Sequence, residues 1–309
     1  MQVFDHQAAP LAEITARARA FFAGNWREIP IRPRFHSLLI GPTGTGKTAL
    51  ATMVAESVGA TLVRISVPGW MPAGATGRSV AETIATIAQA VALNNRTLLA
   101  LDELEKGCAP ASNSFSNADS PWQQHCRLEI YDLLDGRWPQ GLKMPNADDD
   151  EEASSSRELF TQKLQETVFI LGLGTFQAFF DSASNRRTIG FCEEADTAVE
   201  EICLDDIIEK LPRELTNRFC GLIRLPELRE EHYRLIARQA EESLPERMRQ
   251  AFGQEIDRRI HSAISAKKGV RFLEEAMLEV LKSLPSEPPI KLSLPLLTPD
   301  PDIIDTCIL

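Results

Sequence analysis

The chain has 309 residues, of which 43% are hydrophobic and 25% charged, an ordinary composition for a globular protein with one large core or two modest ones. Its formal net charge of −11 argues against a broad nucleic-acid-binding surface, so we expect no direct nucleic-acid contact. The sequence has no apolar run near the roughly 20 residues that span a membrane and no signal-peptide pattern at its start, which favours a cytoplasmic protein.

The first predicted elements surround a glycine-rich turn. Residues 8–24 have apolar side chains at near-helical spacing, which predicts a helix. His36–Ile40 is a short apolar run that is typical of a buried strand, and Ala49–Val58 has the composition of a helix. Between them Gly41–Thr48 reads Gly-Pro-Thr-Gly-Thr-Gly-Lys-Thr, so the glycines lie on a predicted strand-to-helix turn.

This octapeptide fits the phosphate-binding pattern G-x-x-x-x-G-K-[ST], known as Walker A. The backbone N–H groups of such a turn cradle phosphate oxygens, and the following helix N-terminus favours negative charge. Lys47 is expected to reach the β- and γ-phosphates, and the hydroxyl of Thr48 to bind Mg²⁺. The alternative is a flexible turn rich in Gly and Thr. The residues expected to bind the nucleotide are Gly41, Pro42, Thr43, Gly44, Thr45, Gly46, Lys47, Thr48 and Ala49.

The following elements alternate between strands and helices. Thr61–Val67 predicts a strand, Pro68–Gly77 a loop, and Ser79–Leu93 a helix. Thr97–Glu103 is an apolar strand that ends in two carboxylates. Asp102 there is positioned to hold Mg²⁺ through water, and Glu103 to act as general base toward the water that attacks the γ-phosphate. An apolar run that ends in Asp-Glu is weak on its own, but after a phosphate loop it reads as a Walker B motif.

The second half of the chain changes from strands to helices. After a Ser/Asn-rich loop, Trp122–Leu134 predicts a helix, and 137–163 forms a polar insertion whose acidic run favours a solvated, disordered excursion. The remaining predicted elements are strands at 167–171 and 222–225 and helices at 230–242, 245–263 and 271–283. Alternating strands and helices followed by helices alone predict an α/β fold, a parallel-sheet domain with an α-helical lid domain.

These residues resemble a known family. The phosphate loop, Leu101–Lys106 and the later segments are similar to AAA+ ATPases of the Clp/HslU unfoldase branch, with the ClpX type as the best fit. The resemblance runs from about residue 36 to residue 287. It implies a P-loop ATPase that uses ATP and Mg²⁺, assembles into a ring, expected to be hexameric, and remodels or unfolds protein substrates as a chaperone.

These elements and the resemblance together divide the chain. We expect an N-terminal helical segment at 1–35, a large α/β nucleotide-binding domain at 36–227, a small helical domain at 228–287 and a Pro-rich tail at 288–309.

Three further site residues follow from the resemblance. Residues 167–176 (TVFILGLGTF) look like the sensor-1 strand, which places Thr175 near the γ-phosphate. Residues 212–219 (PRELTNRF) resemble the arginine-finger segment, with Arg218 at the matching position and Arg213 as the local alternative. Lys268-Gly269-Val270-Arg271 is similar to the sensor-2 turn, so Arg271 is expected to contact phosphate from the small domain.

The chain departs from the family where substrate is gripped. The pore loop of these unfoldases carries an aromatic residue and an aliphatic residue between glycines, whereas this chain has Gly74-Ala75-Thr76-Gly77. Ala and Thr offer little apolar area to a threading polypeptide. Trp70-Met71, shortly before, could substitute for the missing pair; the alternative is that Trp70 packs beneath the loop.

Partner predictions are correspondingly mixed. Ile189-Gly190-Phe191 matches the tripeptide with which ClpX-type proteins dock on a barrel peptidase; alternatively it is an apolar anchor in a shortened loop. Residues 1–35 contain no cysteine, so the zinc-binding domain of ClpX-type proteins has no counterpart there, and the scattered cysteines indicate reduced thiols. A second function therefore stays open: a nucleotide-gated assembly or scaffold that acts on a protein or DNA-bound partner without threading it.

Overall fold

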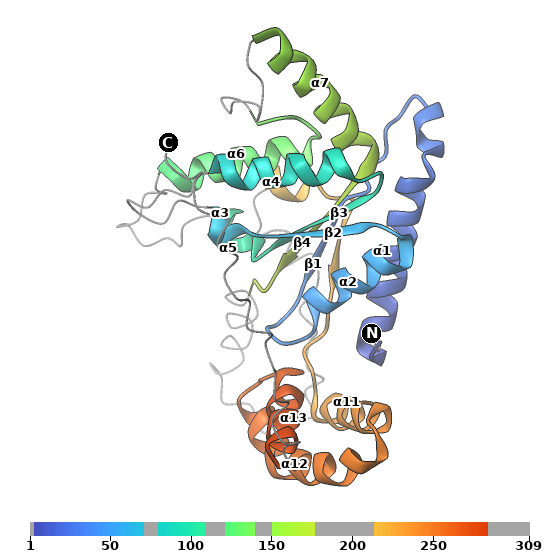
Figure 1. Ribbon diagram of the computed structural model, residues 1–309, viewed down its shortest axis with the longest axis vertical. Helices are drawn as coiled ribbons and strands as arrows, with labels where there is room; N and C mark the ends of the chain where they lie inside the picture. Colours follow the sequence, from blue (N-terminus) through green and yellow to red (C-terminus); the bar gives the residue numbers. More distant parts are fainter. Residues whose placement is uncertain (1–2, 71–79, 109–120, 140–149, 177–212, 284–309) are drawn as a thin grey trace, which may run out of the picture.

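The structure of the protein, a computed structural model, describes residues 3–70, 80–108, 121–139, 150–176 and 213–283. A five-stranded parallel sheet lies at the centre of the larger lobe, with the strand order β2-β3-β4-β1-β5 (Figure 1). The strands are β1 Ser37–Ile40, β2 Thr61–Ser66, β3 Thr97–Asp102, β4 Val168–Gly174 and β5 Gly221–Arg224. The predicted α/β class with a parallel sheet is confirmed.

The helices of the larger lobe are α1 Asp5–Ala23, α2 Lys47–Val58, α3 Val67–Trp70, α4 Val80–Leu93, α5 Leu104–Cys108, α6 Pro121–Leu134, α7 Asp150–Thr167 and α10 Arg213–Thr216. A short 3₁₀ turn, η1, spans Asn25–Glu28. Most predicted elements agree with these bounds to within a few residues. The strand predicted for 61–67 ends one residue earlier, because Val67 begins α3.

Both faces of the sheet are covered by helices, which explains why β1, β3 and β4 are almost continuously apolar. Helices α1 and α2 lie on one face, and α4, α6 and α7 on the other (Figure 1). Neighbouring residues of one strand enter different cores: Leu39 packs with the α1/α2 side, and Leu38 and Ile40 with the α4/α6/α7 side. This alternation is the period-two pattern of a strand buried on both sides.

The polar segment 137–163 differs from the expected disordered excursion. Residues 140–149 lie outside the described ranges, but from Asp150 the chain forms the helix α7. Phe160 and Leu164, four residues apart and so on one helix face, are both buried in the core against the sheet. The expectation was wrong from Asp150 onward, because burial of these two apolar side chains stabilises the helix despite its acidic start.

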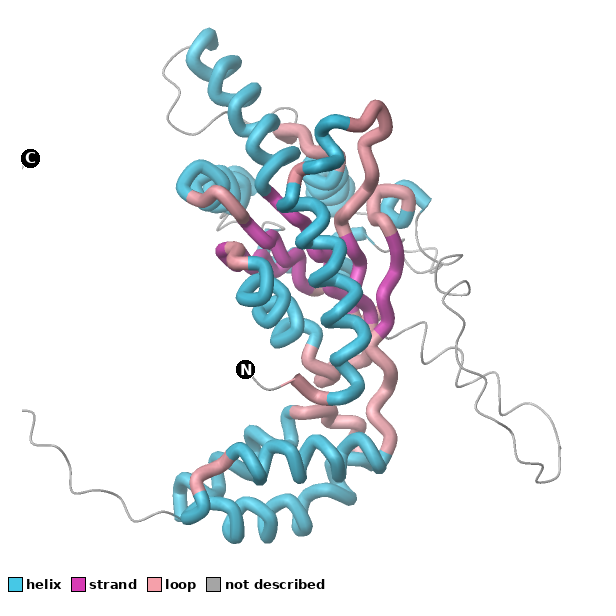
Figure 2. The backbone as a smooth tube through the Cα atoms, turned by 90° about the vertical axis from the view of Figure 1, so that its right-hand side faces the viewer, coloured by secondary structure: helices cyan, strands magenta, loops and turns pink. Residues whose placement is uncertain are grey.

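Three helices form a second lobe with its own apolar core: α11 Glu230–Ser243, α12 Glu246–Ser265 and α13 Arg271–Ser283. Phe252 and Phe272 are completely enclosed in it. Figure 2 shows this lobe at one end of the molecule, with the start of α1 between it and the sheet. The division predicted at residue 227/228 coincides with the passage from β5 into this lobe, and it stays a proposal. Residues 288–309 lie outside the described ranges.

Candidate active site at the carboxyl ends of the strands

The predicted phosphate loop connects β1 to α2 at the carboxyl edge of the sheet. Gly44 and Gly46 have φ angles of 78° and 89°, a backbone region that favours glycine. The loop is anchored to the sheet, since the N–H of Gly41 donates to the carbonyl of Gly174 at 3.2 Å. Its turn is closed by the Thr45 hydroxyl, which donates to the Pro42 carbonyl at 2.9 Å. The sequence pattern therefore lies on the strand-to-helix turn that phosphate binding requires.

Lys47 begins α2 and folds back over its own loop. Its ammonium donates to the carbonyls of Gly41 at 2.7 Å and Pro42 at 2.9 Å. Burial lowers the pKa of Lys47 to about 8, against the opposing pull of the carboxylates of Glu105 and Asp102. A cation held in this way at the centre of the loop suits a phosphate group, because the negative charge of the phosphate would stabilise the protonated form of Lys47.

Thr48 and Asp102 come together as the two expected magnesium ligands. The Thr48 hydroxyl donates to Oδ2 of Asp102 at 3.3 Å, across the gap between α2 and the end of β3. A hydroxyl and a carboxylate side by side are a donor set that fits Mg²⁺, which is commonly held by one or two protein oxygens together with substrate phosphates and water. Arg64 on β2, which the sequence analysis did not single out, contacts the same Oδ2 atom at 3.4 Å.

Glu103, the expected general base, follows directly after β3 with a φ angle of 56°. A positive φ is uncommon for a residue with a side chain and marks backbone strain. The N–H of Glu103 donates to Oδ1 of Asp102 at 3.0 Å, which holds the turn, and the Glu103 side chain is exposed. The carboxylate is thus available to a substrate at the edge of the sheet.

Thr175, the sensor-1 residue that the family resemblance implies, follows β4. It lies beside the phosphate loop because Gly174 is paired with Ile40 in the sheet. Both the N–H and the hydroxyl of Thr175 donate to Oε1 of Glu105, at 3.2 and 2.5 Å. Glu105 is a buried acid of α5 that the sequence does not single out, because nothing in its local pattern distinguishes it from a surface glutamate.

The start of α1 also reaches the phosphate loop. Gln7 is almost fully buried, and its amide nitrogen donates to the carbonyl of Thr45 at 3.3 Å. Nε2 of His6 lies 3.1 Å from the same carbonyl; because a carbonyl only accepts, the ring carries its proton on Nε2. Burial lowers the pKa of His6, and the nearby His232 adds to this effect. Sequence reasoning missed these contacts, since they join residues 38 and 39 positions apart.

The segment that contains the phosphate loop also matches a known protein family. Residues 37–137 match the family model described as ATPase family associated with various cellular activities (AAA). This part of the chain is similar to the AAA family. The match covers about a third of the 309 residues; it includes the phosphate loop, Asp102 and Glu103, and ends before Thr175. No curated protein matches the sequence.

The match supports ATP binding and hydrolysis in general terms, and the order of the strands in the sheet is consistent with it. It does not extend to the segments that carry Arg218 and Arg271, nor does it identify a branch of the family. Among the described residues, no helix is both long and apolar enough to cross a membrane.

Arg218, the expected arginine finger, lies beyond the amino end of β5, at the end of the sheet opposite the phosphate loop. It comes three residues before β5, whose first residue Gly221 is paired with Ser37 at the start of β1. The guanidinium forms an ion pair with Asp135 at 3.0 Å and stacks over the ring of Tyr131, 4.4 Å from its centroid. Arg213, the alternative finger, is exposed at the start of α10.

Arg271 begins α13 and is exposed, and its charge is among those that lower the pKa of Lys47. The turn before it touches the phosphate loop directly, since the N–H of Val270 donates to the carbonyl of Gly44 at 2.7 Å. The turn at 268–271 therefore lies against the phosphate loop, and a contact of Arg271 with phosphate stays a prediction.

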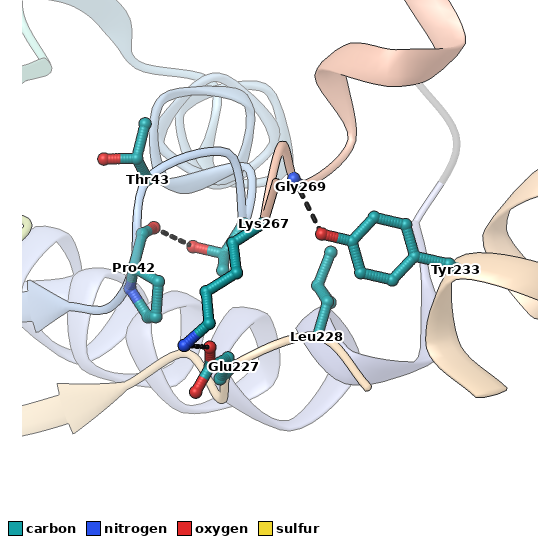
Figure 3. Close-up of a pocket in the computed structure, with 8 residues that line it drawn as sticks. Pro42, Thr43, Glu227, Leu228, Tyr233, Lys267 and Gly269 are labelled. Carbon is teal, nitrogen blue, oxygen red and sulfur yellow. Dashed lines mark hydrogen bonds and ion pairs between the residues drawn. The ribbon is translucent and has the colours of Figure 1, made fainter. Parts of the chain in front are cut away.

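A cavity of about 190 Å³ lies beside the phosphate loop, between the larger lobe and the helical lobe (Figure 3). Pro42 and Thr43 line one side, and Leu228 and Tyr233 the other. The Tyr233 hydroxyl accepts a hydrogen bond from the N–H of Gly269 at 2.9 Å, as the dashed line in Figure 3 shows. No local motif predicts this cavity, because its walls come from separate parts of the chain.

Two predictions concern residues outside the described ranges. Gly74-Ala75-Thr76-Gly77 with Met71, and Ile189-Gly190-Phe191, both lie there. Trp70 is the last residue of α3.

Proposed function

We propose that the chain is a ring-forming ATPase that binds and hydrolyses ATP with Mg²⁺ and uses the energy to remodel or unfold protein substrates, in the manner of ClpX-type proteins. The observation that carries this proposal is the position of Arg218. The phosphate loop leaves the carboxyl end of β1, whereas Arg218 precedes the amino end of the neighbouring strand β5.

This geometry separates Arg218 from the phosphate loop of its own chain. The four residues of β1 span roughly 13 Å at about 3.3 Å per residue, and the two groups lie beyond opposite ends of the strand. An arginine finger at that edge serves the nucleotide of a neighbouring subunit in a head-to-tail ring. Its ion pair with Asp135 and its stacking on Tyr131 orient the guanidinium at the rim.

Within one subunit, the proposed chemistry is shared among few groups. Lys47 and the loop N–H groups bind the β- and γ-phosphates, and Glu103 takes a proton from the attacking water. Thr48 and Asp102 would hold Mg²⁺, which would supply charge neutralisation at the phosphates. Thr175 and Arg271 approach the γ-phosphate from β4 and from the helical lobe. We also propose that the cavity beside Tyr233 admits the nucleotide base.

The test measures ATP turnover against protein concentration together with unfolding of a tagged folded substrate. The proposal expects turnover per subunit to rise with protein concentration, because the site is completed by a neighbour. A Glu103→Gln variant should retain ATP but lose turnover, and Arg137→Ala should behave as wild type, since Arg137 also contacts Asp135 but lies outside the finger segment. Turnover that is independent of oligomer formation would refute the ring.

The second candidate, a nucleotide-gated assembly or scaffold, is favoured by one observation. Residues 74–77 read Gly-Ala-Thr-Gly and lack the apolar pair that grips a threading chain. If substrate unfolding is seen and Trp70→Ala abolishes it, the unfoldase proposal stands. If ATP is turned over without unfolding while a partner protein co-assembles with the ATP-bound chain, the scaffold proposal replaces it. Docking of a barrel peptidase through Ile189-Gly190-Phe191 stays a prediction, tested by co-sedimentation.

A further inference from the structure

Glu105 is a buried acid beside the candidate site that the family resemblance does not assign. Its side chain is 8% exposed. One oxygen, Oε1, accepts both the N–H and the hydroxyl of Thr175. The other, Oε2, is fully buried and has no hydrogen-bond partner among the residues that the structure describes. A buried carboxylate oxygen without a partner is costly, so packing alone does not account for this residue.

The surroundings show that room is made for this carboxylate. A side chain at Gly174 would begin 2.9 Å from Oε2 of Glu105 and closer still to the ring of Phe176. Only glycine at position 174 lets β4 pass so near. The carbonyl of Gly174 also accepts the hydrogen bond from the N–H of Gly41. The end of β4 therefore lies between the Glu105 carboxylate and the phosphate loop. The negative charge of Glu105 raises the pKa of Lys47, so the two side chains attract each other. This attraction offsets part of the cost of burying the Glu105 carboxylate.

We propose that Glu105 is a positioning residue for ATP hydrolysis, which fixes the Thr175 hydroxyl as a hydrogen-bond acceptor for the attacking water. This inference rests on the proposed ATPase function. A threonine hydroxyl has a single proton. Once that proton is donated to Oε1 of Glu105, the Thr175 hydroxyl oxygen can only accept a hydrogen bond from the substrate or its attacking water. The second donor to Oε1, the Thr175 N–H, holds the residue in place.

The resulting arrangement gives the water a defined orientation. One of its hydrogens is donated to Thr175 and the other to the carboxylate of Glu103. The water oxygen forms a bond to the γ-phosphorus, the bond from that phosphorus to the bridging oxygen breaks, and the bridging oxygen leaves as part of ADP. The proton of the water passes to Glu103. Glu105 takes no proton in this sequence; it acts through Thr175 alone.

The experiment measures kcat and KM for ATP with Mg²⁺ on the full chain, in wild type, Glu105→Gln, Thr175→Val and the double variant. Glutamine has the same shape but no charge, and hydrogen bonds to charged groups are about twice as strong as neutral ones. Glu105→Gln should lower kcat about ten-fold with KM changed by less than about two-fold, since it loosens the water rather than the nucleotide. In the Thr175→Val background the same substitution should change kcat by less than about two-fold.

The matched control is Glu129→Gln, which neutralises a buried glutamate of α6 and should leave kcat unchanged. Binding of a fluorescent ATP analogue and the melting temperature report whether each variant is folded. A wild-type kcat in Glu105→Gln, or an equal loss in both backgrounds, would overturn the inference and leave the ATPase proposal intact. Absence of hydrolysis by wild type would overturn both.

Discussion

The backbone N–H of Val270 donates a hydrogen bond to the carbonyl oxygen of Gly44 at 2.7 Å, and this bond ties the helical lobe to the phosphate loop. On another side of the loop, Gln7 and His6 bind the carbonyl of Thr45. Two consecutive carbonyls of the loop are therefore engaged from outside. A loop whose carbonyls are held in this way is pre-organised to offer its N–H groups to phosphate.

Gly269→Ala should weaken ATP binding about ten-fold or more. Gly269 has a φ of 64°, and a Cβ atom there would lie 2.3 Å from the Gly44 carbonyl oxygen, so the turn must move away from the loop. The matched control is Gly59→Ala, which has a φ of 62° but open space around the added atom. The control should cost about 1 kcal/mol of stability and leave affinity unchanged. Equal losses of affinity in both variants would contradict this account, as measured by titration with a fluorescent ATP analogue.

Gln7→Ala should lower ATP affinity roughly two- to ten-fold, which corresponds to the net value of one hydrogen bond of about 0.5–1.5 kcal/mol. The physical reason is that the Thr45 carbonyl loses a buried donor and the loop gains freedom. Arg19→Ala, an exposed substitution on the same helix, is the control. Isothermal titration with ATP and Mg²⁺ measures the affinity of both variants. An unchanged affinity in Gln7→Ala would show that the bond from Gln7 to the Thr45 carbonyl does not support ATP binding.

Arg64→Ala should lower the Mg²⁺ concentration needed for half-maximal ATP turnover, by up to about five-fold. Arg64 contacts the Oδ2 atom of Asp102 that also receives the Thr48 hydroxyl, so its charge competes with the metal. Half of the Arg64 side chain is exposed, and ion pairs of that kind contribute at most about 1 kcal/mol. Arg64→Lys, which keeps the charge, is the control. A higher Mg²⁺ requirement in Arg64→Ala would show that Arg64 assists the site instead.

His36 should make the protein less stable as the pH falls below about 6.5. Its Nδ1 accepts a hydrogen bond from the N–H of Ile170 at 3.0 Å, and burial lowers its pKa to about 3 with help from the charges of Arg32 and Arg34. The unfolded chain, with a pKa near 6.5, takes up the proton first. As far as His36 is concerned, the free energy of unfolding is therefore highest above about pH 6.5. It declines by up to roughly 1.4 kcal/mol per pH unit between about pH 6.5 and 3.

Urea unfolding at pH 7 and pH 5.5 measures this effect. In His36→Asn, whose side-chain oxygen can accept the same hydrogen bond, the difference between the two pH values should shrink. The exposed His261→Asn should retain it. An identical pH dependence in wild type and His36→Asn would assign the effect to other groups.

The sequence predicted the sheet well, and the reason is visible in single residues. Leu98, Leu99, Ala100 and Leu101 are fully buried, so β3 needed to be apolar on both faces and could be recognised by that alone. The acidic start of α7 carried the opposite signal, although Phe160 and Leu164 anchor that helix in the core.

The site was predictable only where its chemistry is local in the chain. Gly41–Thr48 and Asp102-Glu103 are contiguous motifs, and they could be read directly. Glu105 contacts Thr175, which lies 70 positions further along the chain, and Gln7 contacts Thr45, which lies 38 positions further. Neither residue carries a local signature. Such contacts depend on how elements pack, which periodicity does not encode.

Completion of each ATP site by Arg218 of a neighbouring subunit is tested most directly by mixing two inactive variants. Lys47→Ala removes the cation of the phosphate loop, and Arg218→Ala removes the finger. In a ring assembled at random from equal amounts, about a quarter of the interfaces would join an intact loop to an intact finger. ATP turnover should reappear on mixing. If the mixture is no more active than the two variants measured separately, Arg218 does not act across a subunit interface.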